Sequence, residues 1–97
     1  MILFRKLILR DFVQKHSQAT KPINRWIEIV LAANWKDHND LKKAFNSADY
    51  IGNNRYVFNI GGNKFRLVAV VVFINGTMEI RFIGTHDEYG KIDCSEI

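Results

Sequence analysis

The chain has 97 residues, of which 47% are hydrophobic and 25% charged, a balance typical of one small folded domain and not of a disordered segment. A single cysteine, Cys94, excludes an internal disulfide framework and suggests a reducing compartment. No apolar stretch approaches the ~20 residues needed to cross a bilayer, and charge interrupts the apolar N-terminus too soon for a signal peptide. The sequence therefore predicts a single domain over residues 1–97, located in the cytoplasm.

Charge is unevenly distributed along the chain, which carries a formal net charge of +4 and has a pI of about 9.4. Residues 1–25 hold six basic residues against one acid, and residues 50–84 hold four against one. Residues 85–97 reverse the balance, with one basic residue against four acids. A basic body suits a phosphate-bearing partner, although an ordinary solvated surface could give the same distribution.

The first half of the chain predicts helices. Ile2–Phe4 can form a short strand, and apolar residues then recur at helical spacing over residues 6–17. Pro22 stands where the first turn of a helix tolerates proline. The residues behind it form an unbroken apolar stripe at helical spacing: Ile23, Trp26, Ile27, Val30 and Leu31.

A polar break follows this second helix. Trp35, beyond the end of the stripe, is expected to be partly exposed. Asn39 or Asp40 is then a candidate N-cap for a short helix that runs through Phe45.

From residue 50 the apolar pattern takes the period of β-strands. Arg55–Ile60 alternates, Lys64–Ile74 is a long β-branched run, and Thr77–Gly84 returns. Two-residue hairpin loops are predicted between them, at Gly61-Gly62 and Asn75-Gly76. The prediction is an α+β domain, in which a short N-terminal strand and a three-strand meander form a small antiparallel sheet with two helices on one face.

These two hairpins assign residues to the faces of the sheet. With two-residue loops, Arg66 pairs with Val57 and Thr85, and Val70 pairs with Arg81. Side chains alternate between faces, so one face becomes wholly apolar and forms the predicted core. Its members are Tyr56, Phe58, Ile60, Phe65, Leu67, Ala69, Val71, Phe73, Met78, Ile80 and Phe82.

The opposite face is predicted to be uncovered and basic. Glu79 is the only acid on it, and its other residues are Arg55, Val57, Asn59, Lys64, Arg66, Val68, Val70 and Arg81. Because all the charges except that of Glu79 are positive, a surface that binds a polyanion is favoured over a merely solvated face.

The segment Thr85-His86-Asp87-Glu88-Tyr89 follows the last strand, beside the Arg66 end of the sheet. Such a set suits RNA cleavage by the RNA's own 2′-hydroxyl, which needs a base, an acid and cations for the charged phosphorane. His86 could act as base or acid, Arg66 would stabilise charge, and Tyr89 could stack on a base or donate a proton. A histidine at a strand–helix junction is more often a cap or a structural support, so spacing alone leaves both interpretations open.

Other chemistries find less support. The four residues that could bind a metal lack ligand spacing, so no metal or cofactor is predicted: His16, His38, His86 and Cys94. Gly61-Gly62 is too short to cradle a phosphate, and Cys94 has no nearby histidine to activate it as a nucleophile.

The segment Tyr56-Val-Phe-Asn-Ile-Gly-Gly-Asn-Lys-Phe-Arg-Leu67, together with Thr85-His86-Asp87-Glu88-Tyr89, resembles the HigB toxins, a branch of the RelE-like mRNA interferases. The likeness covers nearly the whole chain: a short strand, two helices, a meander and a short C-terminal helix. It implies a bacterial toxin that cuts mRNA without a metal, generally in the decoding site of a translating ribosome. It also implies neutralisation by a HigA-like antitoxin with a helix-turn-helix domain.

Site residues follow from the resemblance by position, with acid and base left unassigned. The implied catalytic residues are Lys64, Arg66, His86 and Tyr89. The residues expected to bind RNA are Arg55, Asn59, Arg81 and Lys91. One departure is Gly90, which stands where relatives commonly have an acid and is expected to end the last helix early.

Two alternatives use the same scaffold. A non-catalytic RNA- or ribosome-binding module would need the basic face but not His86 and Tyr89. A purely structural partner protein would pair the basic surface with an acidic chain.

Overall fold

The computed structural model describes all of residues 1–97, in which three α-helices follow a short first strand and precede four consecutive strands. In chain order the elements are β1 (Ile2–Phe4), α1 (Leu7–Lys15), a 3₁₀ turn (Ser17–Ala19), α2 (Thr20–Ala32), α3 (His38–Ala44), β2 (Asp49–Gly52), β3 (Arg55–Ile60), β4 (Phe65–Val72), β5 (Thr77–Thr85) and α4 (His86–Tyr89). The short N-terminal strand, the helices and the meander are confirmed, and β2 is an addition to the predicted set.

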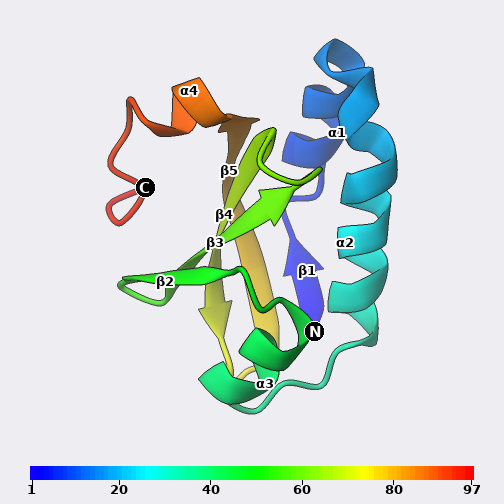
Figure 1. The fold of residues 1–97 in the computed structure, drawn as a ribbon. Coiled ribbons are helices and arrows are strands. Elements are labelled where there is room, and N and C mark those ends of the chain that lie inside the picture. Colours follow the sequence, from blue (N-terminus) through cyan, green and yellow to red (C-terminus); the bar gives the residue numbers. More distant parts are fainter.

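The strands form one sheet in the order β1-β5-β4-β3-β2. β1 runs parallel to β5 and the other pairs are antiparallel, so the sheet is mixed, not wholly antiparallel as predicted. The predicted α+β class is confirmed. α1 and α2 lie on one side of the sheet, and α4 with the C-terminal segment lies on the other (Figure 1). No helix has the length and apolar character that crossing a membrane would require.

The apolar stripe of α2 packs against the sheet, as its spacing predicts. Ile23, Trp26 and Val30 are buried in the main core, whereas Leu31 at the edge of the stripe is half exposed. The 3₁₀ turn leads from α1 directly into α2, which places Pro22 in the first turn of α2, where a proline costs no helical hydrogen bond.

The link between α2 and α3 departs from the prediction twice. Trp35 is 8% exposed and packs edge-on against Phe45, because its large ring gains more from the core than from a surface position. Asp37, not Asn39 or Asp40, caps α3. Its backbone is extended, and its carboxylate accepts the main-chain N–H of Asp40 at 3.0 Å.

The β3–β4 loop contains four residues, 61–64, and not two. Arg66 therefore faces Asn59 and not Val57. Both glycines of the loop have positive φ, 62° and 71°, which residues with a side chain rarely adopt. Because the pairing shifts by two residues, the predicted faces of β3 and β4 are unchanged.

The β4–β5 hairpin has a four-residue loop, 73–76, and a β-bulge at Arg81. The bulge inserts one unpaired residue into β5, which reverses the alternation of faces beyond it. Ile83 therefore enters the main core, and Phe82 lies on the opposite face. The prediction that Phe82 is a core residue is wrong for this reason.

The loop and the bulge also change the predicted cross-strand pairs of β4. Arg66 faces Gly84 and not Thr85, and Val70 faces Glu79 and not Arg81. The site end of the sheet, where β4 begins and β5 ends, is thus one residue out of the predicted register.

The face predicted to be uncovered is partly covered by the C-terminal segment. Cys94 is only 4% exposed and forms a small second core with Val57 and Val68. Tyr89 and Ile97 pack against this cluster. Two valines on this face offer apolar surface that the segment removes from water, so the basic face is smaller than predicted.

Candidate active site

Helix α4 is held at the site end by a reciprocal pair of hydrogen bonds. Thr85 Oγ1 accepts the main-chain N–H of Glu88 at 3.2 Å, and Glu88 Oε1 accepts the main-chain N–H of Thr85 at 2.8 Å. This capping box satisfies two N–H groups that the helix leaves open. The hydrogen bond from the Thr85 backbone is the main reason that the pKa of Glu88 lies below its ordinary value. The Thr-x-x-Glu spacing of residues 85–88 is the sequence pattern that predicts this capping box.

Arg66 is the most unusual cation of this end. It lies on β4 between Asn59 of β3 and Gly84 of β5, and it is half-buried. Its Nη1 atom is buried and has no hydrogen-bond partner within the protein. A buried charged donor without an acceptor is costly, and no residue of the protein offers an acceptor to this atom.

Tyr89 of α4 lies close enough to Arg66 for the guanidinium to influence the pKa of the phenol. Burial raises the pKa of the Tyr89 phenol, Cys94 and Asp49 raise it further, and Arg66 opposes them without reversing the shift. The phenol is half-buried against the second core. Tyr89 therefore keeps its proton at neutral pH beside a guanidinium that can hold an anion.

His86 begins α4 and is exposed. Thr85 caps the helix, so the structural role that a histidine at such a junction often has belongs to another residue here. Phe65 of β4 pairs with Thr85 of β5. Lys64 comes just before Phe65 and His86 just after Thr85, so both residues flank the same cross-strand pair. Lys64 is exposed as well.

Lys91 and Gly90 follow α4 directly. Lys91 is exposed, and its main-chain N–H donates to the Glu88 carbonyl at 3.2 Å. Gly90 is the C-cap of α4, which ends at Tyr89 as expected. Its φ of −66° is one that any residue adopts. The structure thus places Lys64, Arg66 and His86 at the end of the sheet where β4 begins and β5 ends, with Asn59 as the cross-strand neighbour of Arg66. Tyr89 lies near Arg66, and Lys91 follows α4.

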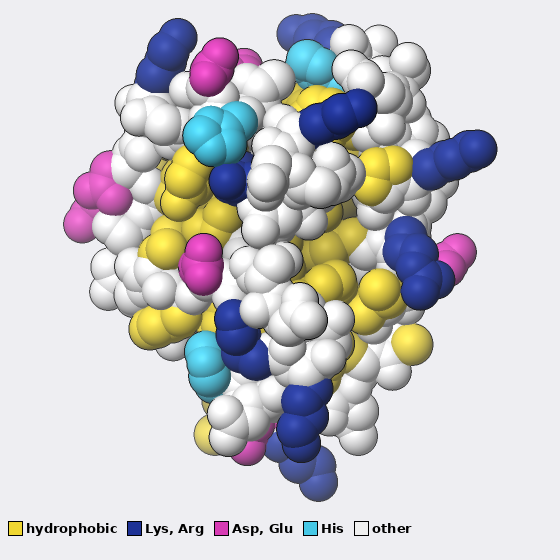
Figure 2. Space-filling model, viewed as in Figure 1, with side chains coloured by type: hydrophobic (Ala, Val, Ile, Leu, Met, Phe, Trp, Pro, Cys, Tyr) yellow, Lys and Arg dark blue, Asp and Glu magenta, His cyan; other side chains and the backbone are white.

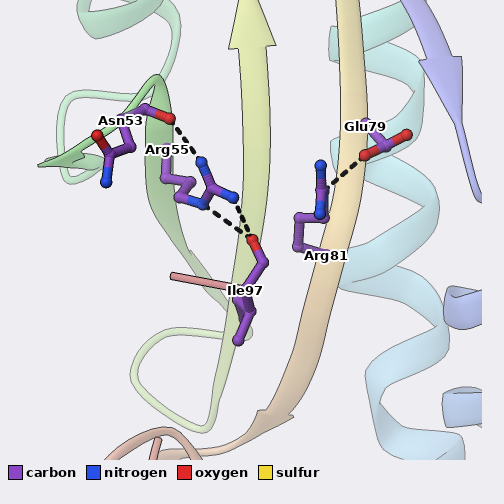
Figure 3. A network of polar contacts seen from close by, with 5 residues as sticks. All are labelled: Asn53, Arg55, Glu79, Arg81 and Ile97. Carbon is purple, nitrogen blue, oxygen red and sulfur yellow. Dashed lines mark hydrogen bonds and ion pairs between the residues drawn. The ribbon is translucent and has the colours of Figure 1, made fainter. Parts of the chain in front are cut away.

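The other two arginines predicted to bind RNA are held by contacts within the protein (Figure 3). Arg55 Nε donates to the main-chain oxygen of Ile97 at 2.9 Å, and Nη1 donates to that of Asn53 at 2.8 Å. Arg81 Nε forms an ion pair with Glu79 at 2.6 Å. Arg55 cannot contact RNA without giving up these partners, whereas Arg81 is engaged through its Nε atom alone.

Arg55 is also distant from the site along β3, four residues or roughly 13 Å before Asn59. The sequence pattern could not reveal that Arg55 is engaged by the C-terminal segment, because that segment has no strand or helix period. No three His, Cys, Asp or Glu side chains come together in the arrangement that a metal ion would need.

Comparisons with known proteins agree with this arrangement. Residues 19–92 match the model of the HigB toxins, described as the RelE-like toxic component of a toxin-antitoxin system. The mRNA interferase toxin HigB of Escherichia coli K12 is 34% identical over 92 residues, which are 92% of this chain and 88% of the relative. The mRNA interferase HigB of Shigella flexneri gives the same values. The mRNA interferase HigB of Escherichia coli O6:H1 is 22% identical over 94 residues, 95% of this chain and 91% of its own length.

The fold and these matches define the toxic component of a toxin-antitoxin system, whose partner is an antitoxin. The chain belongs to the HigB toxin family. The resemblance found in the sequence is confirmed, and mRNA cleavage is the activity that the names of its relatives give.

Proposed function

We propose that this protein is an mRNA endoribonuclease whose active site is formed by Arg66, Tyr89, His86 and Lys64. The observation that carries this proposal is the half-buried guanidinium of Arg66, which has an unpartnered Nη1 atom beside a protonated Tyr89. Family membership supports the same reaction.

In the proposed reaction the 2′-hydroxyl of the RNA loses its proton and attacks the neighbouring phosphorus. The bond to the 5′-oxygen of the next nucleotide breaks, which leaves a 2′,3′-cyclic phosphate and a free 5′-hydroxyl. Arg66 would hold the non-bridging oxygens as negative charge develops on them, and Lys64 would add a second cation.

The proton donor and acceptor are assigned from their surroundings. Tyr89, whose pKa is raised by burial, keeps its proton at neutral pH and would give it to the departing 5′-oxygen. His86 is exposed, and a neutral imidazole has one ring nitrogen that can accept a proton, so His86 would accept the proton of the 2′-hydroxyl.

The setting of the reaction belongs to the same proposal. We expect the messenger to be cut on a translating ribosome in the cytoplasm, and the antitoxin to be a HigA-like protein with a helix-turn-helix domain. Three basic residues of the site are exposed, so a substrate held by a larger partner could reach them: Lys64, His86 and Lys91.

The test is to incubate the purified protein with messenger, alone and on translating ribosomes, and to map new 5′ ends. EDTA is added to the ribosome-free reaction. Cuts that disappear in Tyr89→Phe and His86→Ala support the proposal. Binding to ribosomes without any cuts would contradict it and would favour a non-catalytic ribosome-binding module.

A further inference from the structure

An open groove of about 470 Å³ lies between α2 and the β3–β4 loop, outside the site described above. Apolar residues form its floor, among them Pro22, Trp26 and Ile60, and Lys21 and Arg25 stand on its α2 side. Hydrophobic side chains are visible in the hollow between the meander and α2, with Lys and Arg side chains along the helix (Figure 2).

Both charged residues that line this groove are cations. Lys21 and Arg25 are four residues apart on α2 and therefore share one side of the helix. Both are exposed, and neither forms an ion pair, since the two ion pairs of the protein lie elsewhere. The nearest acid along the helix, Glu28, makes none with Arg25.

Trp26, one of the residues that line the groove, has a buried donor without a partner. Trp26 is 2% exposed, and its indole Nε1 is buried with no acceptor within the protein. The two cations, which have no carboxylate partner, suit a ligand that carries negative charge. A cationic groove with an apolar floor fits single-stranded nucleic acid, whose bases stack on apolar and aromatic surfaces while its phosphates bind cations.

The groove adjoins the site across one short loop. Asn59 lines the groove and faces Arg66 across the β3–β4 pair. Gly61 and Gly62 line it too, and Lys64 follows them in the same loop. A strand of RNA that leaves Arg66 can therefore pass Lys64 and enter the groove without meeting an acidic residue of that loop.

We propose that this groove binds the single-stranded RNA next to the cleavage site, with its phosphates on Lys21 and Arg25. The inference rests on the proposed function, because the groove would hold the RNA that the adjoining site cuts. An acidic peptide could also neutralise the two cations. Continuity with Arg66 and the apolar floor favour RNA.

The test compares the double variant Lys21→Gln/Arg25→Gln with the charge-matched control Lys36→Gln/Lys43→Gln, both checked for an unchanged unfolding midpoint. Lys36 and Lys43 are exposed and form no ion pair. Lys43 lies in α3 and Lys36 two residues before its start, and α3 lies away from the β3–β4 loop (Figure 1). The probe is a fluorescent single-stranded RNA of about a dozen nucleotides, titrated between about 50 and 200 mM salt.

Loss of two phosphate contacts should weaken binding several-fold at low salt. It should also reduce the slope of log affinity against log salt by about 1.4, since each contact on a single strand contributes about 0.7. The control should keep the slope of the unchanged protein. In cleavage, the double variant should raise KM and leave kcat unaltered, since it lacks binding and not chemistry.

Three results would overturn the inference. The slope of the double variant could equal that of the control. The unchanged protein could fail to bind the free RNA at low salt, which would leave cleavage on ribosomes, and so the proposed function, standing. The double variant could bind RNA normally but lose binding to a polyglutamate peptide, which would make the groove a protein-binding surface.

Discussion

At the scale of single residues, the site depends on Arg66 and Tyr89, which lie close to each other. The guanidinium has an unpartnered donor, and the phenol beside it is kept protonated by burial. A phosphate placed between them would satisfy the first and accept a proton, through its leaving oxygen, from the second. His86 is free to act as the third group, because Thr85 and not His86 caps the helix.

Tyr89→Phe tests this arrangement. The variant keeps the ring that packs against the second core and removes only the acidic hydroxyl, so kcat should fall by about 10²- to 10⁴-fold while KM changes little. Steady-state cleavage assays on the same messenger would measure both constants. A kcat within about threefold of the unchanged protein would remove Tyr89 from the proton transfer.

Cys94 gives a prediction for stability against pH. Burial raises the pKa of its thiol above the ordinary value of 9.0, and Asp93 adds to the shift. The folded state therefore holds this proton more tightly than the unfolded state. The contribution is fully present below about pH 9 and is lost as pH rises above it. Denaturant unfolding should show a decline in stability from this pH upward that is weaker in Cys94→Ala, and an equal decline in both proteins would contradict the burial of the thiol.

At the scale of elements, the capping box of Thr85 and Glu88 fixes the start of α4 at the end of β5. Without it, the first turn of a four-residue helix loses its only side-chain cap. Thr85→Ala should cost about 1 kcal/mol of unfolding free energy, measured with denaturant. It should lower cleavage by more than the lost folded fraction explains, since His86 and Tyr89 both lie on α4. Glu88→Gln retains an acceptor and is the milder companion variant.

The bulge in β5 is a second feature of this scale. It places Ile83 in the core and Phe82 on the partly covered face. Ile83→Ala should therefore cost about 2–5 kcal/mol, and Phe82→Ala clearly less, although phenylalanine is the larger side chain. Denaturant unfolding of the two variants measures both losses of stability. A larger loss of stability in Phe82→Ala would contradict the bulge and support the regular register that the sequence predicts.

At the scale of the whole molecule, periodic features were predictable and local irregularities were not. The stripe of α2 and the alternation of β3 and β4 each repeat over several residues, so the core face and the cations of the meander followed from them. Arg66, Lys64 and His86 reached one end of the sheet as predicted. The bulge at Arg81 depends on packing between two strands, and one inserted residue moved Phe82 out of the core.

The C-terminal segment shows the same limit. Its residues have no period, yet Cys94 is buried and the main-chain oxygen of Ile97 binds Arg55. The groove of Lys21 and Arg25 also combines a helix with a distant loop, which no local pattern brings together. The family motif located the site, but the free or engaged state of each arginine came only from tertiary contacts.

The most direct test of the proposed active site is the cleavage rate of Arg66→Ala, beside Arg10→Ala as the matched loss of one arginine. Arg10 is exposed on α1 and forms only a long surface pair with Asp11. Mapped 5′ ends on messenger should fall at least about 100-fold in rate for Arg66→Ala and remain unchanged for Arg10→Ala, with both variants folded. Undiminished cleavage by folded Arg66→Ala would show that the unpartnered guanidinium does not hold the reacting phosphate.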